Sequence, residues 1–308
     1  MVKYNSCFCK CFSLNLFLIL TIFEQEIECG NTEPSYRSQG GDWGGICATG
    51  KKQSPINVVR NETIKTKFTP FSFTNYEQEI SLKISNTKRS LKFSAPDDYL
   101  PIYVQGGGLQ GTYQFLQGHM HWSPEDNSGS EHTIDGKAFP MELHLVHYNT
   151  KYGKTAGEAI ASNEYNALAV LSIMFDVKER EDNKELQPLF DSISKITKSG
   201  ETTKTGKIKP SALILDDRYF FRYNGSLTTP GCNEIVVWTL FKVPLMISQK
   251  QFDEVLKTTN SKMEKNSDNY RSVQNLNGRT VLDSSSTRIP NTNILVLIFS
   301  LLCIKTVY

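Results

Sequence analysis

All five histidines of the 308-residue chain lie between residues 119 and 147, which constrains the fold more than any other feature. One run reads Gln117-Gly118-His119-Met120-His121-Trp122, and another reads Glu142-Leu143-His144-Leu145-Val146-His147. In a β-strand, side chains two residues apart project from the same face. If the two runs are neighbouring strands, His119, His121 and His144 converge on one point. Three neutral imidazoles with a fourth position open to water are typical of a catalytic zinc site.

Two residues are expected behind these ligands. A zinc-bound imidazole usually donates its second N–H to an oxygen acceptor. Gln117 precedes His119 by two residues, and Glu142 precedes His144 by two, so each shares a strand face with its ligand. The alternative, ordinary buried core histidines, fits a lone histidine better than a His-x-His run beside a Glu-x-His run.

The composition is that of an ordinary globular protein, with 39% hydrophobic and 21% charged residues. A net charge of +2, without a dense basic patch interleaved with aromatic residues, gives no indication of nucleic-acid binding.

Both ends of the chain resemble removable targeting segments. Residues 1–29 have lysines and then an apolar stretch, Phe12–Phe23, which is typical of a secretory signal peptide. Residues 284–308 begin with Ser284-Ser285-Ser286, continue with a polar spacer and end with the apolar run Ile294–Ile304. This order predicts a glycolipid-anchor signal that is removed, and the apolar run is shorter than the about 20 residues of a membrane span. The expected mature chain is residues 30–283, held at the outer face of the plasma membrane or, as a second option, secreted.

Removal of both ends leaves Cys47 and Cys232, with Cys29 depending on the cleavage point. Two cysteines in an oxidising compartment suggest one disulfide, although two free buried thiols are the alternative. Asn61-Glu62-Thr63 and Asn224-Gly225-Ser226 are glycosylation sequons. Asn61 is the more accessible site by expectation, whereas Asn224 is close to the proposed metal centre.

Hydrophobic patterning predicts one mainly β domain with peripheral helices, an α+β fold. Helical periodicity runs from Leu186 to Ile196, and Ser248 with Gln251 predicts a capping box that starts a second helix. The strand candidates are the alternating pairs around Leu82–Ile84 and Leu91–Phe93, and Pro101–Gln105, Tyr113–Trp122, Met141–Tyr148, Asn166–Phe175 and Ile235–Val243.

Five motifs in the expected order resemble the alpha-class carbonic anhydrases, over about Tyr36 to Arg279. They are Gln53–Asn57, Gln117–Trp122, Ser130–Thr133, Glu142–His147 and Ser226–Pro230. The resemblance implies a single domain built on a large, twisted, mainly antiparallel sheet. It also implies Zn²⁺ on His119, His121 and His144, with Asn269 joining Gln117 and Glu142 around the ligands, and a Cys47–Cys232 disulfide. Tyr223 and His132 are expected to form a structural pair, with His147 a structural histidine.

The implied activity is reversible hydration of CO2 to bicarbonate and a proton. Zinc lowers the pKa of its bound water to about 7, an effect for which carbonic anhydrase is itself the standard example, and the hydroxide attacks CO2. Thr228 is expected to orient the hydroxide and to donate to Glu131, while Thr229 helps to position water or bicarbonate. Sulfonamide-type inhibitors are expected to bind. The residues that match the apolar wall for CO2 are Val146, Val170, Leu227, Val236 and Trp238.

One departure from the family concerns proton transfer. Efficient members carry a histidine shuttle on the cleft rim, whereas this chain has Lys88 and Arg89 at the matching place. Lysine and arginine stay protonated near neutral pH and cannot relay a proton, so the chain is expected to lack the usual shuttle. The alternative function is a surface binding or adhesion module of the carbonic-anhydrase type with little activity. The presence of all three histidines, Glu131 and Thr228 favours the enzyme.

Overall fold

Two long antiparallel strands, β7 (Tyr113–Trp122) and β9 (Met141–Asn149), form the centre of the sheet. The computed structural model describes residues 36–125, 128–178, 181–260 and 268–284. The register pairs His119 with His144, and it shifts between Phe115 and Gln117 at a bulge or irregularity. Both strands were predicted, and β7 has the predicted ends.

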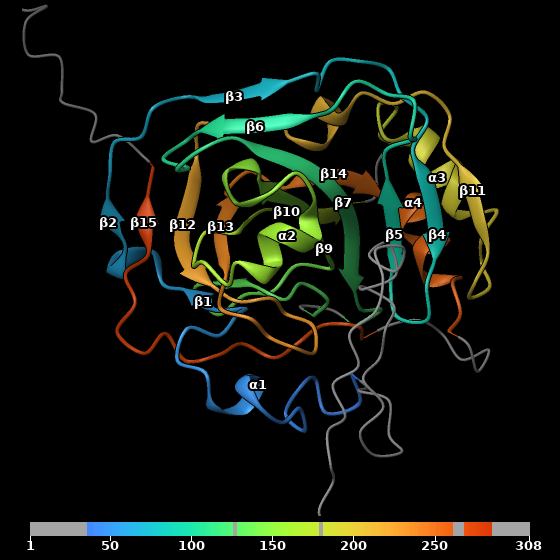
Figure 1. Cartoon of the computed structure of the whole chain (residues 1–308). Coiled ribbons are helices and arrows are strands. Elements are labelled where there is room, and N and C mark those ends of the chain that lie inside the picture. Colours follow the sequence, from blue (N-terminus) through green and yellow to red (C-terminus); the bar gives the residue numbers. More distant parts are fainter. Residues whose placement is uncertain (1–35, 126–127, 179–180, 261–267, 285–308) are drawn as a thin grey trace, which may run out of the picture. The chain divides into compact units, whose positions relative to one another are not determined.

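The described strands form one large mixed sheet and a small parallel pair (Figure 1). The order across the large sheet is β11 (Thr202–Lys204), β4 (Lys83–Asn86), β5 (Leu91–Ser94), β7, β9, β10 (Leu168–Lys178), β13 (Val236–Phe241), β12 (Phe220–Gly225), β15 (Leu282–Asp283) and β2 (Ile64–Lys65). Beside this path, β3 (Phe71–Thr74) pairs with β6 (Tyr103–Gly106), which also pairs with β7, and β14 (Leu245–Ser248) pairs with β10. The small pair is β1 (Asn57–Val58) with β8 (Thr133–Ile134).

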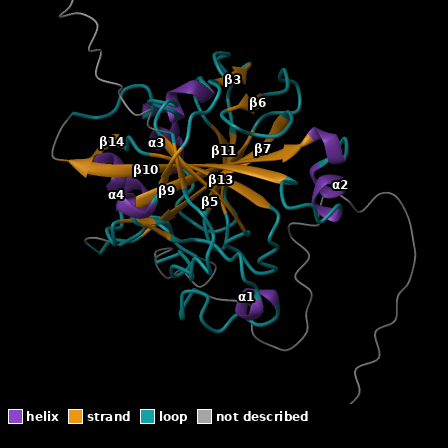
Figure 2. Ribbon diagram, turned by 90° about the vertical axis from the view of Figure 1, so that its left-hand side faces the viewer, coloured by secondary structure: helices purple, strands orange, loops and turns teal. Residues whose placement is uncertain are grey.

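Most strand pairs are antiparallel, and the exceptions in the large sheet are β10 with β13, β10 with β14 and β15 with β2. A side view shows the strands fanning out, as the right-handed twist of β-strands requires (Figure 2). These features confirm the predicted fold class.

The helices are short and lie outside the sheet. The capping box predicted at Ser248 is present and starts α4 (Gln249–Leu256). The helix predicted over Leu186–Ile196 is shorter, α3 (Gln187–Ile193), because Ser194 and the residues after it turn away from the helix. The remaining elements are α1 (Ile46–Thr49), α2 (Ala156–Ala161), η2 (Arg60–Glu62), η3 (Thr150–Tyr152) and η4 (Pro210–Leu213). None of the helices within the described ranges is long and apolar enough to cross a membrane.

Both faces of the central strands are covered, since every residue of β9 is buried. Leu143 and Leu145 lie on one face, in a core cluster that includes residues of α3 and α4 such as Phe190 and Phe252. Val146 and Tyr148 lie on the other face, in a second cluster. His144 shares this second face by alternation, so the ligand side of the sheet is opposite to α3 and α4.

Candidate metal centre

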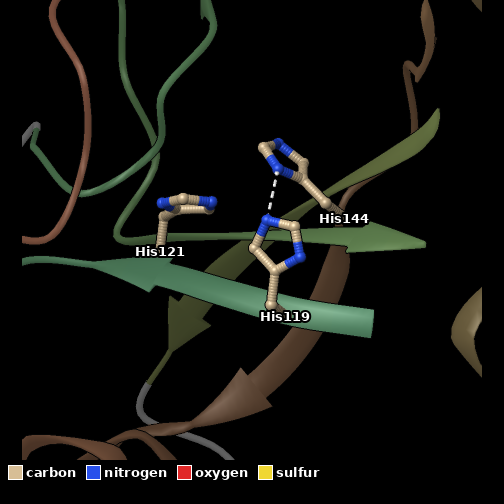
Figure 3. Close-up of side chains that lie close together, drawn as sticks. All are labelled: His119, His121 and His144. Carbon is tan, nitrogen blue, oxygen red and sulfur yellow. Dashed lines mark hydrogen bonds between the residues drawn. The ribbon is translucent and has the colours of Figure 1, made fainter. Parts of the chain in front are cut away.

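Three imidazoles converge on the face of β7 and β9 that lies opposite α3 and α4. His119 and His121 come from β7, and His144 comes from β9, directly across from His119. Each can offer one nitrogen, and these nitrogens all lie within 4.8 Å of one another. His144 Nδ1 and His119 Nε2 lie 3.3 Å apart (Figure 3). This is the arrangement that the i, i+2 spacing predicted.

The second nitrogen of each ring is held by an oxygen acceptor. His119 Nδ1 lies 3.0 Å from Gln117 Oε1, and His144 Nε2 lies 2.7 Å from Glu142 Oε1. His121 Nδ1 lies 2.7 Å from the backbone oxygen of Asn269. Because these contacts fix the ring orientations, His119 Nε2, His121 Nε2 and His144 Nδ1 are left to face one another.

The donor set fits a zinc ion. His121 Nε2 is buried and has no hydrogen-bond partner among the described residues, which is costly unless something binds it. Burial lowers the pKa of His121 to about 3, and burial also lowers the pKa of His119 and His144. All three rings are therefore neutral near pH 7, the state in which imidazole binds metal.

Glu142 organises a buried network behind the ligands. Its carboxylate accepts hydrogen bonds from the Ser172 hydroxyl at 2.6 Å and the His132 backbone N–H at 2.8 Å, and it contacts the rings of His132 and His144, both at 2.7 Å. Burial alone raises the pKa of Glu142, but the two histidines outweigh it and hold that pKa well below its usual range. His132, Glu142 and His144 could themselves hold a metal by spacing, but their nearest polar atoms are already hydrogen-bonded to one another.

Glu131 lies on the open side of the triad, with its Oε2 at 3.5 Å from His121 Nε2. The backbone N–H of Arg271 donates to its Oε1 at 2.8 Å. Burial, followed by the nearby charge of Glu142, raises the pKa of Glu131 well above its usual range, and the Thr228 side chain and Arg271 offset this rise only in part. A bound dication next to this carboxyl would act in the opposite direction to burial and favour its ionised form. Thr228 is buried, and Thr229 is half-buried on the same loop.

The predicted apolar wall lies in one cluster beside the ligands. Four of its residues are buried and the fifth packs against them; they are Val146, Val170, Val236 and Trp238, with Leu227. The Trp238 ring centroid is 4.8 Å from that of His144 and 4.7 Å from that of His132. The Trp238 indole N–H donates to the backbone oxygen of Ser226, so its polar atom is satisfied away from the wall.

The disulfide expected between Cys47 and Cys232 is present. It supports the loop that carries Thr228 and Thr229, because the Cys232 N–H donates to the Thr229 backbone oxygen at 3.0 Å. Gly231 has φ +104°, which a proline at this place could not adopt. Gly231 thus allows a left-handed turn next to the disulfide.

Lys88 and Arg89 lie in the turn between β4 and β5, where the missing shuttle was expected. Lys88 is exposed and Arg89 is half-buried. The backbone oxygen of Arg89 accepts a hydrogen bond from the Asn269 side chain at 2.7 Å, and the backbone oxygen of Asn269 in turn contacts His121. The turn is thus connected to the metal centre through a single residue.

The structural pair expected from the family is found, the expected structural histidine has a partner that was not predicted, and one important residue was missed. His132 Nε2 lies 2.6 Å from the Tyr223 hydroxyl, and His147 Nε2 lies 2.6 Å from the hydroxyl of Tyr76, which was not predicted. The missed residue is Arg271, whose buried guanidinium donates to Gln53 Oε1 and to the backbone oxygens of Ser54 and Cys47. Nothing in local sequence connects Arg271 with Glu131, since 140 residues separate them.

Comparison with known proteins agrees with this geometry. Residues 38–285 match the family model for eukaryotic-type carbonic anhydrase. The chain is 36% identical to carbonic anhydrase 4 of Rattus norvegicus over 263 residues, which is 83% of this chain and 82% of the relative. It is 33% identical to putative carbonic anhydrase 5 of Caenorhabditis elegans, over 78% of this chain and 77% of the relative. Identity to human carbonic anhydrase 7 is 34%, over 76% and 89%. On these matches and on the zinc-competent triad, the chain belongs to the eukaryotic-type carbonic anhydrases.

Proposed function

We propose that this carbonic anhydrase interconverts CO2 and bicarbonate at the outer cell surface, and that it works without a histidine proton shuttle. The observation that carries the catalytic part is the converging triad, with the unpartnered His121 Nε2 beside Glu131. When bound there, zinc supplies the acidity that ionises a water molecule near neutral pH.

Thr228 and Glu131 orient the nucleophile. The Thr228 hydroxyl accepts a hydrogen bond from the nucleophile and donates its own proton to Glu131, because an ionised carboxylate can only accept. The Thr228 side chain and the Arg271 backbone N–H favour the ionised form of Glu131, and a bound dication would act with them against burial and the Glu142 charge, which raise its pKa. The nucleophile's lone pair then points at the substrate, and Thr229 helps to position water or bicarbonate.

The apolar wall holds CO2. A nonpolar gas gains little from polar contacts, so a dry surface beside the nucleophile is sufficient to concentrate it. Trp238 and Val146 provide this surface and belong to one hydrophobic cluster. Val146 lies on the face of β9 that carries His144, and the Trp238 ring lies against the His144 ring. Bicarbonate is charged and is not retained by such a wall.

Proton export is the step for which the chain lacks a dedicated side chain. A relay group works best with a pKa near the working pH, which is the property of histidine. All five histidines lie at or behind the metal centre, and the rim carries Lys88 and Arg89 instead. The proton therefore leaves through water and external buffer.

The proposed location rests on both chain ends, which lie outside the described residues apart from Ser284. Residues 1–29 act as a signal peptide, residues 30–283 form the catalytic domain, and residues 284–308 direct attachment of a glycolipid anchor. Asn61 is exposed in η2, and Asn224 is exposed on β12, so both asparagine side chains are accessible for glycosylation.

Metal analysis and CO2 hydration on the purified protein test the catalytic proposal. We expect one zinc per chain, loss of activity on chelation and recovery on zinc addition. His121→Ala removes stoichiometric zinc and activity, whereas His147→Gln, a histidine on the opposite face of β9, keeps the zinc. Full metal content in His121→Ala contradicts the ligand assignment.

Mass spectrometry of the mature protein tests the location. We expect no peptide from Ile294–Tyr308, glycans on the sequons, and release from cells by a phospholipase that cleaves glycolipid anchors. Recovery of the C-terminal peptide from membrane-bound protein would favour a short membrane span instead.

A further inference from the structure

A row of side chains crosses four neighbouring strands at the level of the metal ligands. Ser85 of β4 pairs with Lys92 of β5, Lys92 pairs with His119 of β7, and His119 pairs with His144 of β9. Residues directly opposite in neighbouring strands project from the same face, with strands about 4.8 Å apart. Lys92 therefore lies on the ligand face, one strand away from His119, and it is half-buried.

Arg89 brings a second cation to the same side. Burial raises the pKa of Tyr36, the charge of Glu131 raises it further, and the charge of Arg89 opposes both effects. Arg89 and Glu131 thus act on the same phenol. The turn that holds Arg89 is fixed by hydrogen bonds of the Thr87 hydroxyl with the backbone of Ser90 and by the Asn269 side chain.

Acidic residues also lie near this edge, because Asp268 and Glu125 both hydrogen-bond with Ser123. Asp268 is one carboxylate on the same edge, and it accepts a hydrogen bond from the Ser123 hydroxyl at 2.6 Å. Three cations lie on this edge, Lys88 and Arg89 in the β4–β5 turn and Lys92 in β5. The carboxylates of Glu131 and Glu142 lie deeper, where both are buried.

We infer that Lys92 and Arg89 make the mouth of the metal centre selective for anions, so that an anionic ligand binds more tightly than a neutral ligand of the same shape. The inference rests on the proposed function, since the ligand is taken to bind at the three histidines. One unit charge near a bound anion, in partly solvated surroundings, changes the affinity for that anion by about threefold to tenfold.

Bicarbonate is the natural anion to which this selectivity applies. The enzyme does not alter the overall equilibrium, so the ratio of kcat/KM in the two directions is fixed. Tighter bicarbonate binding therefore appears as a lower KM for bicarbonate and slower release of bicarbonate, not as a preferred direction.

A matched pair of inhibitors tests the inference by calorimetry on the zinc-loaded protein. Para-carboxybenzenesulfonamide carries a negative charge at pH 7.5, and para-carbamoylbenzenesulfonamide has nearly the same shape without it. We expect Lys92→Gln to weaken the carboxylate compound about threefold to tenfold and to leave the carbamoyl compound within about twofold. Intrinsic differences between the two compounds cancel because the same pair is compared in both proteins.

Lys83→Gln is the control, because it removes the same charge from the same face of the sheet, two residues along β4 from Ser85. Its effect on the ratio of the two affinities is expected to be clearly smaller. Arg89→Gln provides a second variant and should act in the same direction as Lys92→Gln. Raising the salt from about 20 mM to about 500 mM should reduce the selectivity of the wild type, since salt screens exposed charges.

The outcomes separate this inference from the proposed function. If the carbamoyl compound fails to bind the wild type at one site per zinc, the assignment of the metal centre to the three histidines is wrong. If that compound binds normally and neither Lys92→Gln nor Arg89→Gln changes the affinity ratio, the anion-selective mouth is rejected.

Discussion

The strands that hold the metal ligands and the turn that carries Lys88 and Arg89 differ in how tightly the fold specifies them. Each ligand on β7 and β9 has a partner on its second nitrogen, and every residue of β9 is buried. In the β4–β5 turn, Lys88 is exposed and Arg89 is half-buried. The strands allow little change without loss of the metal, whereas the turn accepts a different residue. The comparison suggests that β7 and β9 fix the metal centre, whereas proton transfer depends on the turn, and ligand charge preference depends on the turn together with Lys92 of the adjacent β5.

The largest effect is expected at Thr228, which acts on the nucleophile and does not bind the metal. Replacing Thr228 with Ala should lower kcat/KM for CO2 about 10²–10³-fold, the usual cost of removing one hydrogen bond aimed at the reacting group. Zinc content should remain near one per chain. Thr228→Ser keeps the hydroxyl and should retain most of the activity. Equal losses in the two variants would show that the hydroxyl does not orient the nucleophile.

The reverse face of β9 should show a pH-dependent stability. Burial lowers the pKa of His147 to about 4, against about 6.5 in an unfolded chain. Because the unfolded state binds the extra proton between these values, the stabilisation is complete above pH 6.5 and is lost as the pH falls toward 4. We expect wild type to lose about 2 kcal/mol between pH 7 and pH 5 from this group alone, at 1.36 kcal/mol per pKa unit.

The control for that prediction removes both partners together. His147→Leu combined with Tyr76→Phe leaves neither hydroxyl nor imidazole unpaired. Denaturant unfolding at the two pH values should then show a smaller pH-dependent loss than in wild type. An identical loss in both proteins would assign the pH dependence to other groups.

Glu142→Gln should weaken the metal-binding strands through a residue that does not touch the metal. Ser172 and the rings of His132 and His144 all contact Oε1 of Glu142, whereas Oε2 accepts from the His132 backbone N–H. Glutamine has one oxygen, so its NH2 group takes the place of Oε2 and faces that N–H donor, and the negative charge that holds the His144 ring is lost. We expect zinc affinity to fall about 10–100-fold, as found for partners of metal-bound histidines. Competition with a chelator of known affinity measures this change, and unaltered affinity would show that ring orientation does not depend on Glu142.

The smallest effect is expected at the turn. Arg89→His introduces a group that can take and release protons near neutral pH. The maximal rate at low buffer concentration should rise severalfold, and its dependence on added imidazole should weaken. Arg89→Gln is the matched control, since it removes the charge without adding a relay, and a similar rise in both variants would point to charge and not to proton transfer.

The sequence predicted the ligand strands well because the alternation pattern that identifies them lies within each strand. Strand alternation places His119 and His121 together, and it places Gln117 and Glu142 beside their ligands. It did not predict that Arg271 holds Glu131, because that contact joins distant segments. Helix α3 ends at Ile193, earlier than the periodicity of Leu186–Ile196 indicated, and Ile196 is buried although it lies beyond the helix.

The position of Lys92 illustrates the same limit. The alternation of Leu91, Lys92 and Phe93 shows that Lys92 faces away from the core side of β5. Its place beside His119 depends on which strand pairs with β5 and in which register, and the sequence alone does not contain that pairing.

The dependence of turnover on buffer in the wild-type enzyme tests the account most directly, because it separates the metal centre from the turn. With stopped-flow CO2 hydration at fixed pH and ionic strength, kcat and kcat/KM are measured as imidazole is raised. An intact metal centre without a shuttle predicts that kcat/KM stays constant while kcat rises markedly with imidazole. A high kcat that is flat from low to high buffer concentration would contradict the account.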